Sequence, residues 1–181
     1  MSIFNDFFAQ FTKSSAAPVD NSFVGGLTLL DVEPGDQGGV WKDTYDYAFE
    51  QARDSIGVPF ALLKAHAIRE SALKPGAYRQ EPSGKASYGL MQVLWWKNSN
   101  RFALFGYPDD SIGDGSLLYD PVANCLIAAS IIKDNWQRLG NLRDTINAYN
   151  TGVKESVRVA PGNYVNDVLK NYSTLIGKKV T

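Results

Sequence analysis

The apolar residues of this 181-residue chain recur mainly three or four positions apart, the spacing of one helix face. They predict five longer helices and one or two short ones, over residues 43–56, 58–71, 90–105, 120–139, 142–149 and 164–176. Asp120-Pro121 favours a helix start, because the carboxylate caps the first turn and proline lacks an amide hydrogen that would stay unpaired there. No alternating apolar and polar run is long enough to predict a sheet. We therefore expect a mostly α-helical domain at residues 41–181, with little or no sheet and with polar loops at 76–88 and 107–117.

Residues 1–40 form an N-terminal extension of different character. Its first segment places five apolar side chains on one helical face: Ile3, Phe4, Phe7, Phe8 and Phe11. Residues 13–40 are rich in turn formers and predict a linker. The aromatic helix either docks on the domain that follows or contacts a partner or a membrane surface. We interpret the extension as a tether.

Composition and charge exclude several classes of function. Eighteen Lys and Arg against 19 Asp and Glu give a net charge of −1, so nucleic acid is not an expected partner. A single cysteine, Cys125, and a single histidine, His66, exclude an internal disulfide and a His- or Cys-rich metal site, and no cofactor is expected. No apolar run approaches the roughly 18 residues that span a membrane. The first ten residues do not resemble a secretory signal, which predicts synthesis in the cytoplasm.

Glu70 is the strongest candidate for chemistry. It lies at the end of the apolar run 58–71, in which Phe60, Leu63 and Ala67 share one helical face, so the carboxyl should lie in the last turn of a buried helix. There both the helix dipole and low solvation oppose ionisation. A carboxyl that stays protonated near neutral pH can act as a general acid.

Three later segments supply groups that suit a sugar-binding site. Gly89-Leu-Met-Gln92 combines a flexible backbone with a thioether and an amide, Ala148-Tyr-Asn150 ends a helix with a phenol and an amide, and Tyr164-Val165 adds a second phenol. Together with Glu70-Ser71, these segments resemble the four signature segments of the soluble lytic transglycosylase catalytic domain, which is related in fold to goose-type lysozyme. The resemblance extends from about residue 45 to 177.

The resemblance implies cleavage of the β-1,4 bond between N-acetylmuramic acid and N-acetylglucosamine in peptidoglycan, with a 1,6-anhydro end as product. Glu70 would first protonate the glycosidic oxygen and later accept the proton of the C6 hydroxyl. The N-acetyl carbonyl of the substrate would stabilise the cation, in place of a second carboxylate. Tyr149 is expected to hydrogen-bond the Glu70 carboxyl and set its orientation.

The other signature residues are expected to bind substrate. Met91 and Gln92, with Gly89, would line the sugar cleft, whereas Leu90 packs in the core. Ser71 either lies near the N-acetyl subsites or caps the end of its helix. Asn150 either contacts the ligand or fixes its own turn, and Tyr164 contributes an aromatic hydroxyl.

Glu81 is the candidate for a second carboxylate. If it reached across the cleft it could activate a water, and the enzyme would be a hydrolytic muramidase. A glutamate in a polar loop before a proline is also a common solvated charge. Asp109 and Asp114 are weaker candidates of the same kind. A third reading, from another class, is a glycan-binding or structural protein that keeps the fold without turnover.

Several residues near the candidate site have structural explanations. His66, one turn before Glu70, is interpreted as a core histidine, and Cys125 and Trp136 as core residues. Trp95, Trp96, Tyr107 and Tyr119 could stack on sugar rings.

A catalytic domain without a secretory signal, joined by a linker to an aromatic segment, favours a bacteriophage enzyme that is either carried in the virion or released for lysis. The extension would dock on a virion or tail protein, and the domain would act in the periplasm or cell wall.

Overall fold

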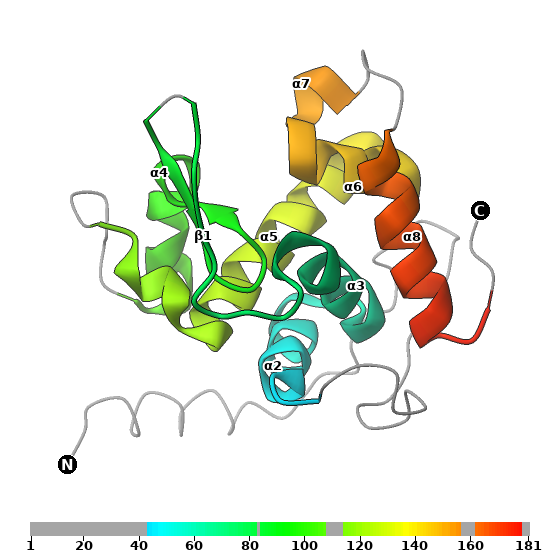
Figure 1. The fold of residues 1–181 in the computed structure, drawn as a ribbon, viewed down its shortest axis with the longest axis horizontal. Coiled ribbons are helices and arrows are strands. Elements are labelled where there is room, and N and C mark those ends of the chain that lie inside the picture. The colour runs from blue at the N-terminus through cyan, green and yellow to red at the C-terminus, as the bar shows by residue number, and fades with distance from the viewer. Residues whose placement is uncertain (1–42, 83, 108–113, 157–161, 179–181) are drawn as a thin grey trace.

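The computed structural model describes residues 43–82, 84–107, 114–156 and 162–178 (Figure 1). Their longer helices are α2 (Asp46–Ile56), α3 (Phe60–Ser71), α5 (Pro121–Leu139), α6 (Leu142–Thr151) and α8 (Asn163–Leu175). Each corresponds to one of the five helices predicted from the apolar spacing, so the mostly helical fold is confirmed. The predicted extension, residues 1–40, lies outside the described residues.

The helix ends follow the signals in the sequence. Asp120 accepts a hydrogen bond from the amide of Ala123, which caps the first turn of α5. Gly57 and Gly140 end α2 and α5 with φ values of 86° and 68°, in the left-handed region that glycine enters without steric penalty. Helix α6 runs two residues beyond the predicted end at Tyr149 and stops at Gly152.

A small antiparallel sheet occupies part of the region predicted to be a polar loop. Strands β1 (Tyr78–Gln80) and β2 (Ala86–Tyr88) form a hairpin, and β3 (Val93–Leu94) pairs with the other side of β2. The loop prediction for 76–88 is therefore wrong. Strands this short carry no detectable alternation, and all three residues of β1 are exposed, so no apolar signal marks it.

Short helical segments connect the sheet to α5, and one more connects α6 to α8. They are α4 (Trp95–Asn98) and the 3-10 helices η1 (Ser99–Phe105) and η2 (Ser116–Tyr119), with α7 (Val153–Ser156) after α6. The break after Asn98 was predicted, whereas η2 and α7 were not. No helix in the described part of the chain is both long enough and apolar enough to cross a bilayer.

Helix α3 lies at the centre of the fold, between α2 and α8 (Figure 1). All residues from Phe60 to Ala67 are buried, including Lys64 and His66. The Lys64 ammonium is paired with the Asp46 carboxylate of α2 at 2.7 Å, which compensates the burial of its charge. Because α3 is enclosed on most sides, the position of its last turn, and hence of Glu70, is fixed by the surrounding helices.

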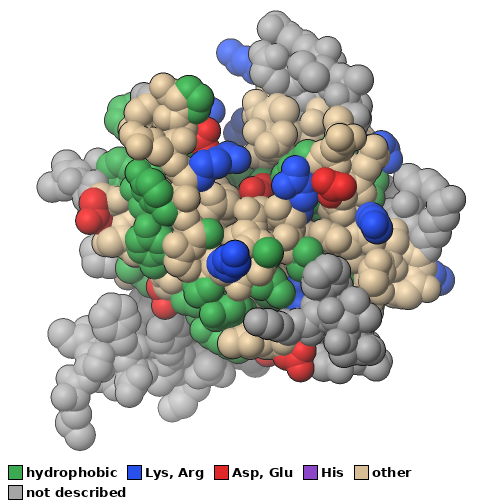
Figure 2. Space-filling view, in the orientation of Figure 1, with side chains coloured by type: hydrophobic (Ala, Val, Ile, Leu, Met, Phe, Trp, Pro, Cys, Tyr) green, Lys and Arg blue, Asp and Glu red, His purple; other side chains and the backbone are tan. Residues whose placement is uncertain are grey.

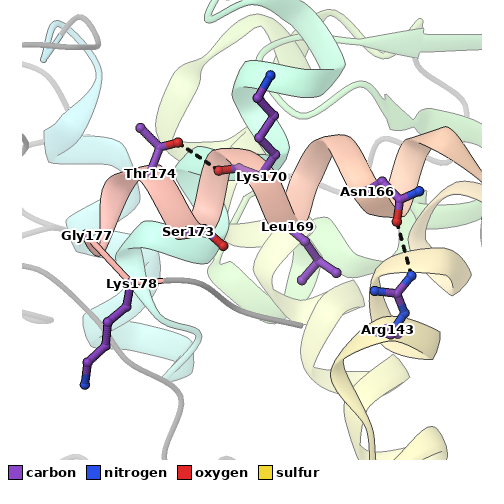
Figure 3. A pocket seen from close by; sticks show the side chains of 8 residues that line it. All are labelled: Arg143, Asn166, Leu169, Lys170, Ser173, Thr174, Gly177 and Lys178. Atoms are coloured by element: carbon purple, nitrogen blue, oxygen red, sulfur yellow. Dashed lines mark hydrogen bonds between the residues drawn. The ribbon is translucent and has the colours of Figure 1, made fainter.

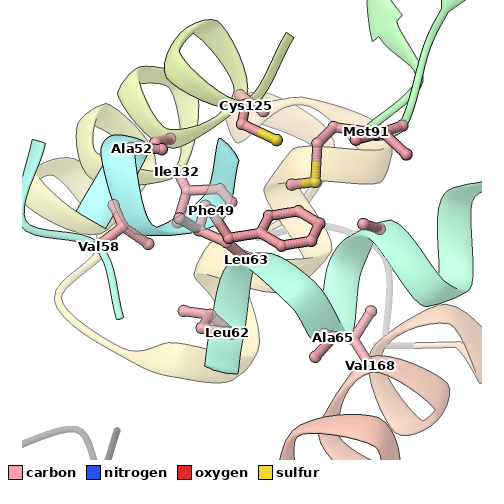
Figure 4. Close-up of a cluster of buried hydrophobic side chains, with 14 of the residues drawn as sticks. Phe49, Ala52, Val58, Leu62, Leu63, Ala65, Met91, Cys125, Ile132 and Val168 are labelled. Atoms are coloured by element: carbon pink, nitrogen blue, oxygen red, sulfur yellow. The ribbon is translucent and has the colours of Figure 1, made fainter. Parts of the chain in front are cut away.

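The core collects side chains from all the longer helices and from the loop after β2. Figure 4 shows Phe49 of α2 and Cys125 of α5 on the same side of α3 as Met91, while Val168 of α8 lies beside Ala65 on the other side of that helix. Cys125 is fully buried and Trp136 is 6% exposed, so both are core residues as predicted.

Candidate active site

A cleft of about 610 Å³ is lined by residues of the β1–β2 hairpin and of the end of α6, and Glu70 lies in its wall. The hairpin contributes charged and polar groups, the segment from Gln92 to Asn98 forms one side, and residues 148–152 form the other. In Figure 2, Lys and Arg groups lie on both sides of a small acidic area on this face. A long polymer with polar substituents fits such an open groove better than a small enclosed ligand.

Glu70 is in the last turn of α3, as its sequence context predicted. Burial raises the pKa of its carboxyl above the ordinary value. The hydrogen bond from Tyr164 and the charges of Arg79 and Arg69 oppose this rise, while the nearby charge of Glu81 adds to it. The net effect is a carboxyl that keeps its proton to a higher pH than a solvated glutamate.

Tyr164, not Tyr149, holds the Glu70 carboxyl. The Tyr164 hydroxyl lies 2.6 Å from Glu70 Oε1, whereas the Tyr149 hydroxyl donates to the Met91 carbonyl at 2.8 Å. The prediction for Tyr149 is therefore corrected. Both tyrosines point inward, but α8 packs along α3 and brings Tyr164 to its last turn. Tyr149 lines the cleft and ties α6 to the loop that follows β2.

His66 is fully buried, in agreement with its interpretation as a core residue. Its Nδ1 lies 3.1 Å from the Tyr164 hydroxyl, so Glu70, Tyr164 and His66 form a continuous chain of contacts. Burial lowers the pKa of the imidazole to about 3, so the ring is neutral at ordinary pH. Nε2 is buried and has no hydrogen-bond partner among the described residues.

The loop from Gly89 to Gln92 is pinned by Asn124, a residue that sequence reasoning missed. The Asn124 side chain donates to the carbonyls of Tyr88 and Leu118, each at 2.9 Å, and accepts from the Met91 amide at 2.8 Å. It is fully buried on α5. A polar residue among the core-facing positions Ala123 and Leu126 was the available signal, because a buried amide requires partners.

Gly89 and Met91 do not line the cleft, contrary to the prediction. Gly89 has φ 77°, and a Cβ there would lie 2.2 Å from the Leu118 carbonyl oxygen and 2.4 Å from Asn124 Nδ2. The glycine therefore allows close approach of two backbone segments. The Met91 side chain is fully buried and points into the core (Figure 4).

Gln92 and Asn150 line the cleft, whereas Ser71 has a structural role. Gln92 lines the cleft, and its amide nitrogen also donates to the carbonyls of Ala77 and Gly89. Asn150 is exposed and lines the cleft. Ser71 is outside the cleft lining: its hydroxyl donates to the Leu90 carbonyl at 2.7 Å and accepts from the Lys74 amide, which fastens the end of α3 to the loop.

Glu81 shares the cleft with Glu70, but its Oε1 is already engaged. It is paired with Arg79 at 2.8 Å and accepts from the Ser87 hydroxyl at 3.1 Å. Asp114 accepts a bond from the amide of Ser116 in a turn, and this bond lowers its pKa. It does not line the cleft. Asp109 lies outside the described residues.

The four aromatic candidates for sugar stacking are not among the residues that line the cleft. Trp95 and Tyr107 pack against the core, and Tyr119 packs edge-on against Tyr88. Trp96 is 58% exposed, and its ring lies 4.1 Å from the Nζ of Lys85, which does line the cleft. Of the four, Trp96 is therefore the best placed to stack on a sugar ring, because it is exposed beside a residue of the cleft.

Asn135 of α5 is a further cleft residue that the sequence did not reveal. It is 6% exposed, and its amide nitrogen has no hydrogen-bond partner within the described part of the chain. Within the same part, no group of three or more His, Cys, Asp or Glu side chains is placed to hold a metal ion.

A second hollow, of about 530 Å³, lies along α8 (Figure 3). Arg143 donates to Asn166 across it at 3.2 Å, while Lys170 and Lys178 point to opposite sides. These basic groups do not converge, so the hollow lacks the arrangement of a specific site.

The chain resembles known proteins over the region that contains the cleft. Residues 47–166 match the family model described as the transglycosylase SLT domain. The chain is 31% identical over 127 residues to the invasion protein IagB of Salmonella typhimurium, which covers 70% of this chain and 76% of the relative. It is 25% identical over 124 residues to protein IpgF of Shigella flexneri, covering 68% and 78% of the two chains.

A solved structure supports the fold. The 70 kDa soluble lytic transglycosylase SLT70 of Escherichia coli superposes with a TM-score of 0.59 and 24% identity. The match covers 77% of this chain but only 25% of the larger enzyme.

Proposed function

This chain belongs to the family of transglycosylase SLT domains, and we propose that it cleaves the N-acetylmuramic acid–N-acetylglucosamine bond of peptidoglycan with formation of a 1,6-anhydro end. One observation carries this proposal: Glu70, a carboxyl with a raised pKa, lies in the wall of an open cleft and is oriented by Tyr164. A single oriented acid is what bond cleavage without a carboxylate nucleophile requires.

In the first step, protonated Glu70 donates its proton to the glycosidic oxygen. The bond from this oxygen to C1 of the muramic acid breaks, and the departing sugar keeps the proton. The N-acetyl carbonyl oxygen of the muramic acid bonds to C1 and takes up the developing positive charge. Tyr164 holds Oε1 of Glu70 at this stage, which leaves Oε2 for the substrate.

In the second step, the C6 hydroxyl oxygen of the same sugar attacks C1. The bond between C1 and the carbonyl oxygen breaks, and ionised Glu70 accepts the hydroxyl proton. Glu70 is thereby reprotonated and the cycle closes without a water molecule. A residue that acts as acid and then as base works best with a pKa near the working pH, which the burial of Glu70 favours.

Hydrolysis with Glu81 as the base is the second candidate. Glu81 lies in the same cleft as Glu70, and its charge raises the pKa of the Glu70 carboxyl. Against it, Oε1 of Glu81 is engaged by Arg79 and Ser87. These contacts compete with a water for the same carboxylate oxygen, so Glu81 is the weaker candidate for activating one. The anhydro product is therefore favoured.

The proposed role of Glu70 is tested by Glu70→Gln. Turbidity clearing of purified peptidoglycan should fall on the order of 10²- to 10⁴-fold, because the amide cannot donate or accept the reacting proton. Glu50→Gln on α2, outside the cleft lining, is the matched control and should keep wild-type activity. Full activity of Glu70→Gln would contradict the proposal, and wild-type chain that clears no peptidoglycan would indicate a non-catalytic role.

We further propose that residues 1–40 tether the domain to a larger assembly, such as a bacteriophage tail or injection apparatus, which delivers it to the cell wall. The aromatic face of residues 3–11 and the linker after it support this idea, and the family match begins only at residue 47. The test compares incorporation of the full chain and of a chain lacking residues 1–40 into virions. Equal incorporation would contradict the tether.

A further inference from the structure

His66 is a buried histidine that contacts the catalytic machinery without touching the cleft. Its Nδ1 lies 3.1 Å from the Tyr164 hydroxyl, which in turn lies 2.6 Å from Glu70 Oε1. His66 and Tyr164 are 0% and 8% exposed, and neither lines the cleft. The Tyr164 hydroxyl carries one hydrogen and lies between two possible acceptors, Glu70 Oε1 and His66 Nδ1. The tautomer of His66 therefore determines toward which of them that hydrogen points.

Two arrangements of hydrogens fit the contacts. In the first, His66 Nδ1–H donates to the Tyr164 oxygen, and the Tyr164 hydroxyl donates to Glu70 Oε1. In the second, Glu70 carries its proton on Oε1 and donates to Tyr164, which donates to a bare Nδ1. The neutral ring then has its hydrogen on Nε2.

The surroundings of Nε2 favour the first arrangement. Nε2 is buried and has no hydrogen-bond partner among the described residues. The second arrangement would bury an unpaired N–H donor there, whereas the first leaves only a lone pair. The ring is also neutral, because burial lowers its pKa to about 3.

The catalytic cycle favours the first arrangement as well. The Tyr164 hydroxyl can donate to Oε1 whether Glu70 is ionised or carries its proton on Oε2. In the second arrangement, each ionisation of Glu70 would require the Tyr164 hydroxyl to turn and the buried His66 ring to exchange tautomers. The first arrangement needs no movement of buried hydrogens while Glu70 gives and takes its proton.

We propose that His66 is a positioning residue, whose Nδ1–H directs the Tyr164 hydroxyl onto Oε1 of Glu70 and so keeps the transferable proton on Oε2. This role rests on the proposed function, in which Oε2 serves the substrate. It also explains why a polar ring occupies the fully buried face of α3 beside Ala65 and Ala67.

Other ionisable groups surround this chain of contacts. From α6, the Tyr149 ring lies 5.0 Å from the His66 ring, and from α3 itself Arg69 lies over the Tyr164 ring at 5.4 Å. The hairpin adds the charges of Arg79 and Glu81 near Glu70. None of the four forms a hydrogen bond with His66, so within the described residues the Tyr164 hydroxyl is the one partner of His66 Nδ1.

The tautomer can be measured directly, because His66 is the only histidine in the chain. We expect long-range ¹H–¹⁵N NMR spectra of the ¹⁵N-labelled full chain to show a neutral ring protonated on Nδ1 and bare on Nε2, at about pH 5 to about pH 8. Tyr164→Phe removes the acceptor and should shift the ring toward the Nε2–H tautomer. An Nε2–H ring in the wild-type chain would overturn the proposal.

The positioning role is tested by activity and its pH dependence. His66→Leu keeps the bulk but has no donor, and it should lower kcat on the order of 10- to 100-fold with little change in KM. It should also move the alkaline limb of the kcat profile to higher pH, because a weakened bond from Tyr164 stabilises the Glu70 carboxylate less. A merely structural residue would change stability without moving this limb.

His66→Asn provides the matched rescue, because its side-chain amide can place an N–H donor near the position of Nδ1. It should recover much of the kcat that His66→Leu loses. Wild-type kcat and pH profile in a folded His66→Leu chain would overturn the proposal. If His66→Leu fails to fold, the wild-type NMR spectrum decides. An inactive wild-type chain with an Nδ1–H ring would contradict the proposed function but keep the hydrogen-bond assignment.

Discussion

The hydroxyl of Tyr164 on α8 lies 2.6 Å from Oε1 of Glu70 on α3, although 94 residues separate the two in sequence. This contact joins the helix that carries the acid to the last helix of the domain. The packing of α8 along α3 therefore determines which oxygen of the carboxyl is held by a hydrogen bond.

Removal of the Tyr164 hydroxyl should mainly lower activity, whereas removal of the Tyr149 hydroxyl should mainly lower stability. Tyr164→Phe should lower kcat on the order of 10- to 100-fold, because the Glu70 carboxyl loses the bond that orients it. Tyr149→Phe removes the bond to the Met91 carbonyl and should destabilise the fold by about 1 kcal/mol, with a smaller effect on kcat. Steady-state kinetics and urea unfolding of both variants separate the effects. The reverse pattern would show that Tyr149 orients the acid.

The pH dependence of activity should respond to the two hairpin charges in opposite directions. The first step needs protonated Glu70, so activity falls as pH rises through its pKa, which lies above the ordinary 4.5. Arg79→Gln removes a cation that lowers this pKa and should shift the alkaline limb upward. Glu81→Gln removes an anion that raises it and should shift the limb downward. The measurement is the pH profile of kcat for the wild type and the two variants. Shifts of both variants in the same direction would contradict the opposite effects of these charges on the pKa of Glu70.

The Glu81→Gln variant also addresses the hydrolytic alternative. If Glu81 activated water, Glu81→Gln would lose activity on the order of 10²-fold or more, not merely shift its profile.

Gly89 should be far less tolerant of a side chain than Gly140, although both have positive φ. Gly140→Ala should cost about 1–2 kcal/mol for the left-handed backbone alone, since a Cβ added there would have no other atom within 4 Å. Gly89→Ala should cost several kcal/mol more, because its Cβ would overlap the Leu118 carbonyl and the Asn124 side chain. Chemical denaturation compares the two variants, and equal losses would mean that the Leu118 carbonyl and the Asn124 side chain can both move aside.

The sequence predicted the helices and the acid, because long apolar stripes and a carboxyl at a helix end depend on local spacing. It did not predict which tyrosine contacts Glu70, since that depends on how α6 and α8 approach α3. Met91 shows the same limit. Its motif indicated a place near the cleft, but the tight turn at Gly89 and the anchoring by Asn124 direct its side chain into the core.

Acid should destabilise the fold partly through His66. The unfolded ring takes up a proton near pH 6.5, whereas the folded ring stays neutral to about pH 3. The contribution of the neutral ring to stability is therefore complete above pH 6.5 and is lost as pH falls toward 3. Between about pH 7 and about pH 5, wild-type should lose about 2 kcal/mol of unfolding free energy beyond the loss in His66→Gln. Parallel pH dependences in urea unfolding would show that the folded ring titrates normally.

The most direct test of the account is the mass of the products released from purified peptidoglycan by the wild-type chain. Cyclisation at Glu70 without water predicts muropeptides with a 1,6-anhydro end, each lighter by one water than the corresponding reducing-end product. Digestion in ¹⁸O-labelled water should leave these products unlabelled. Reducing-end products that carry ¹⁸O at C1 would contradict the single-acid mechanism.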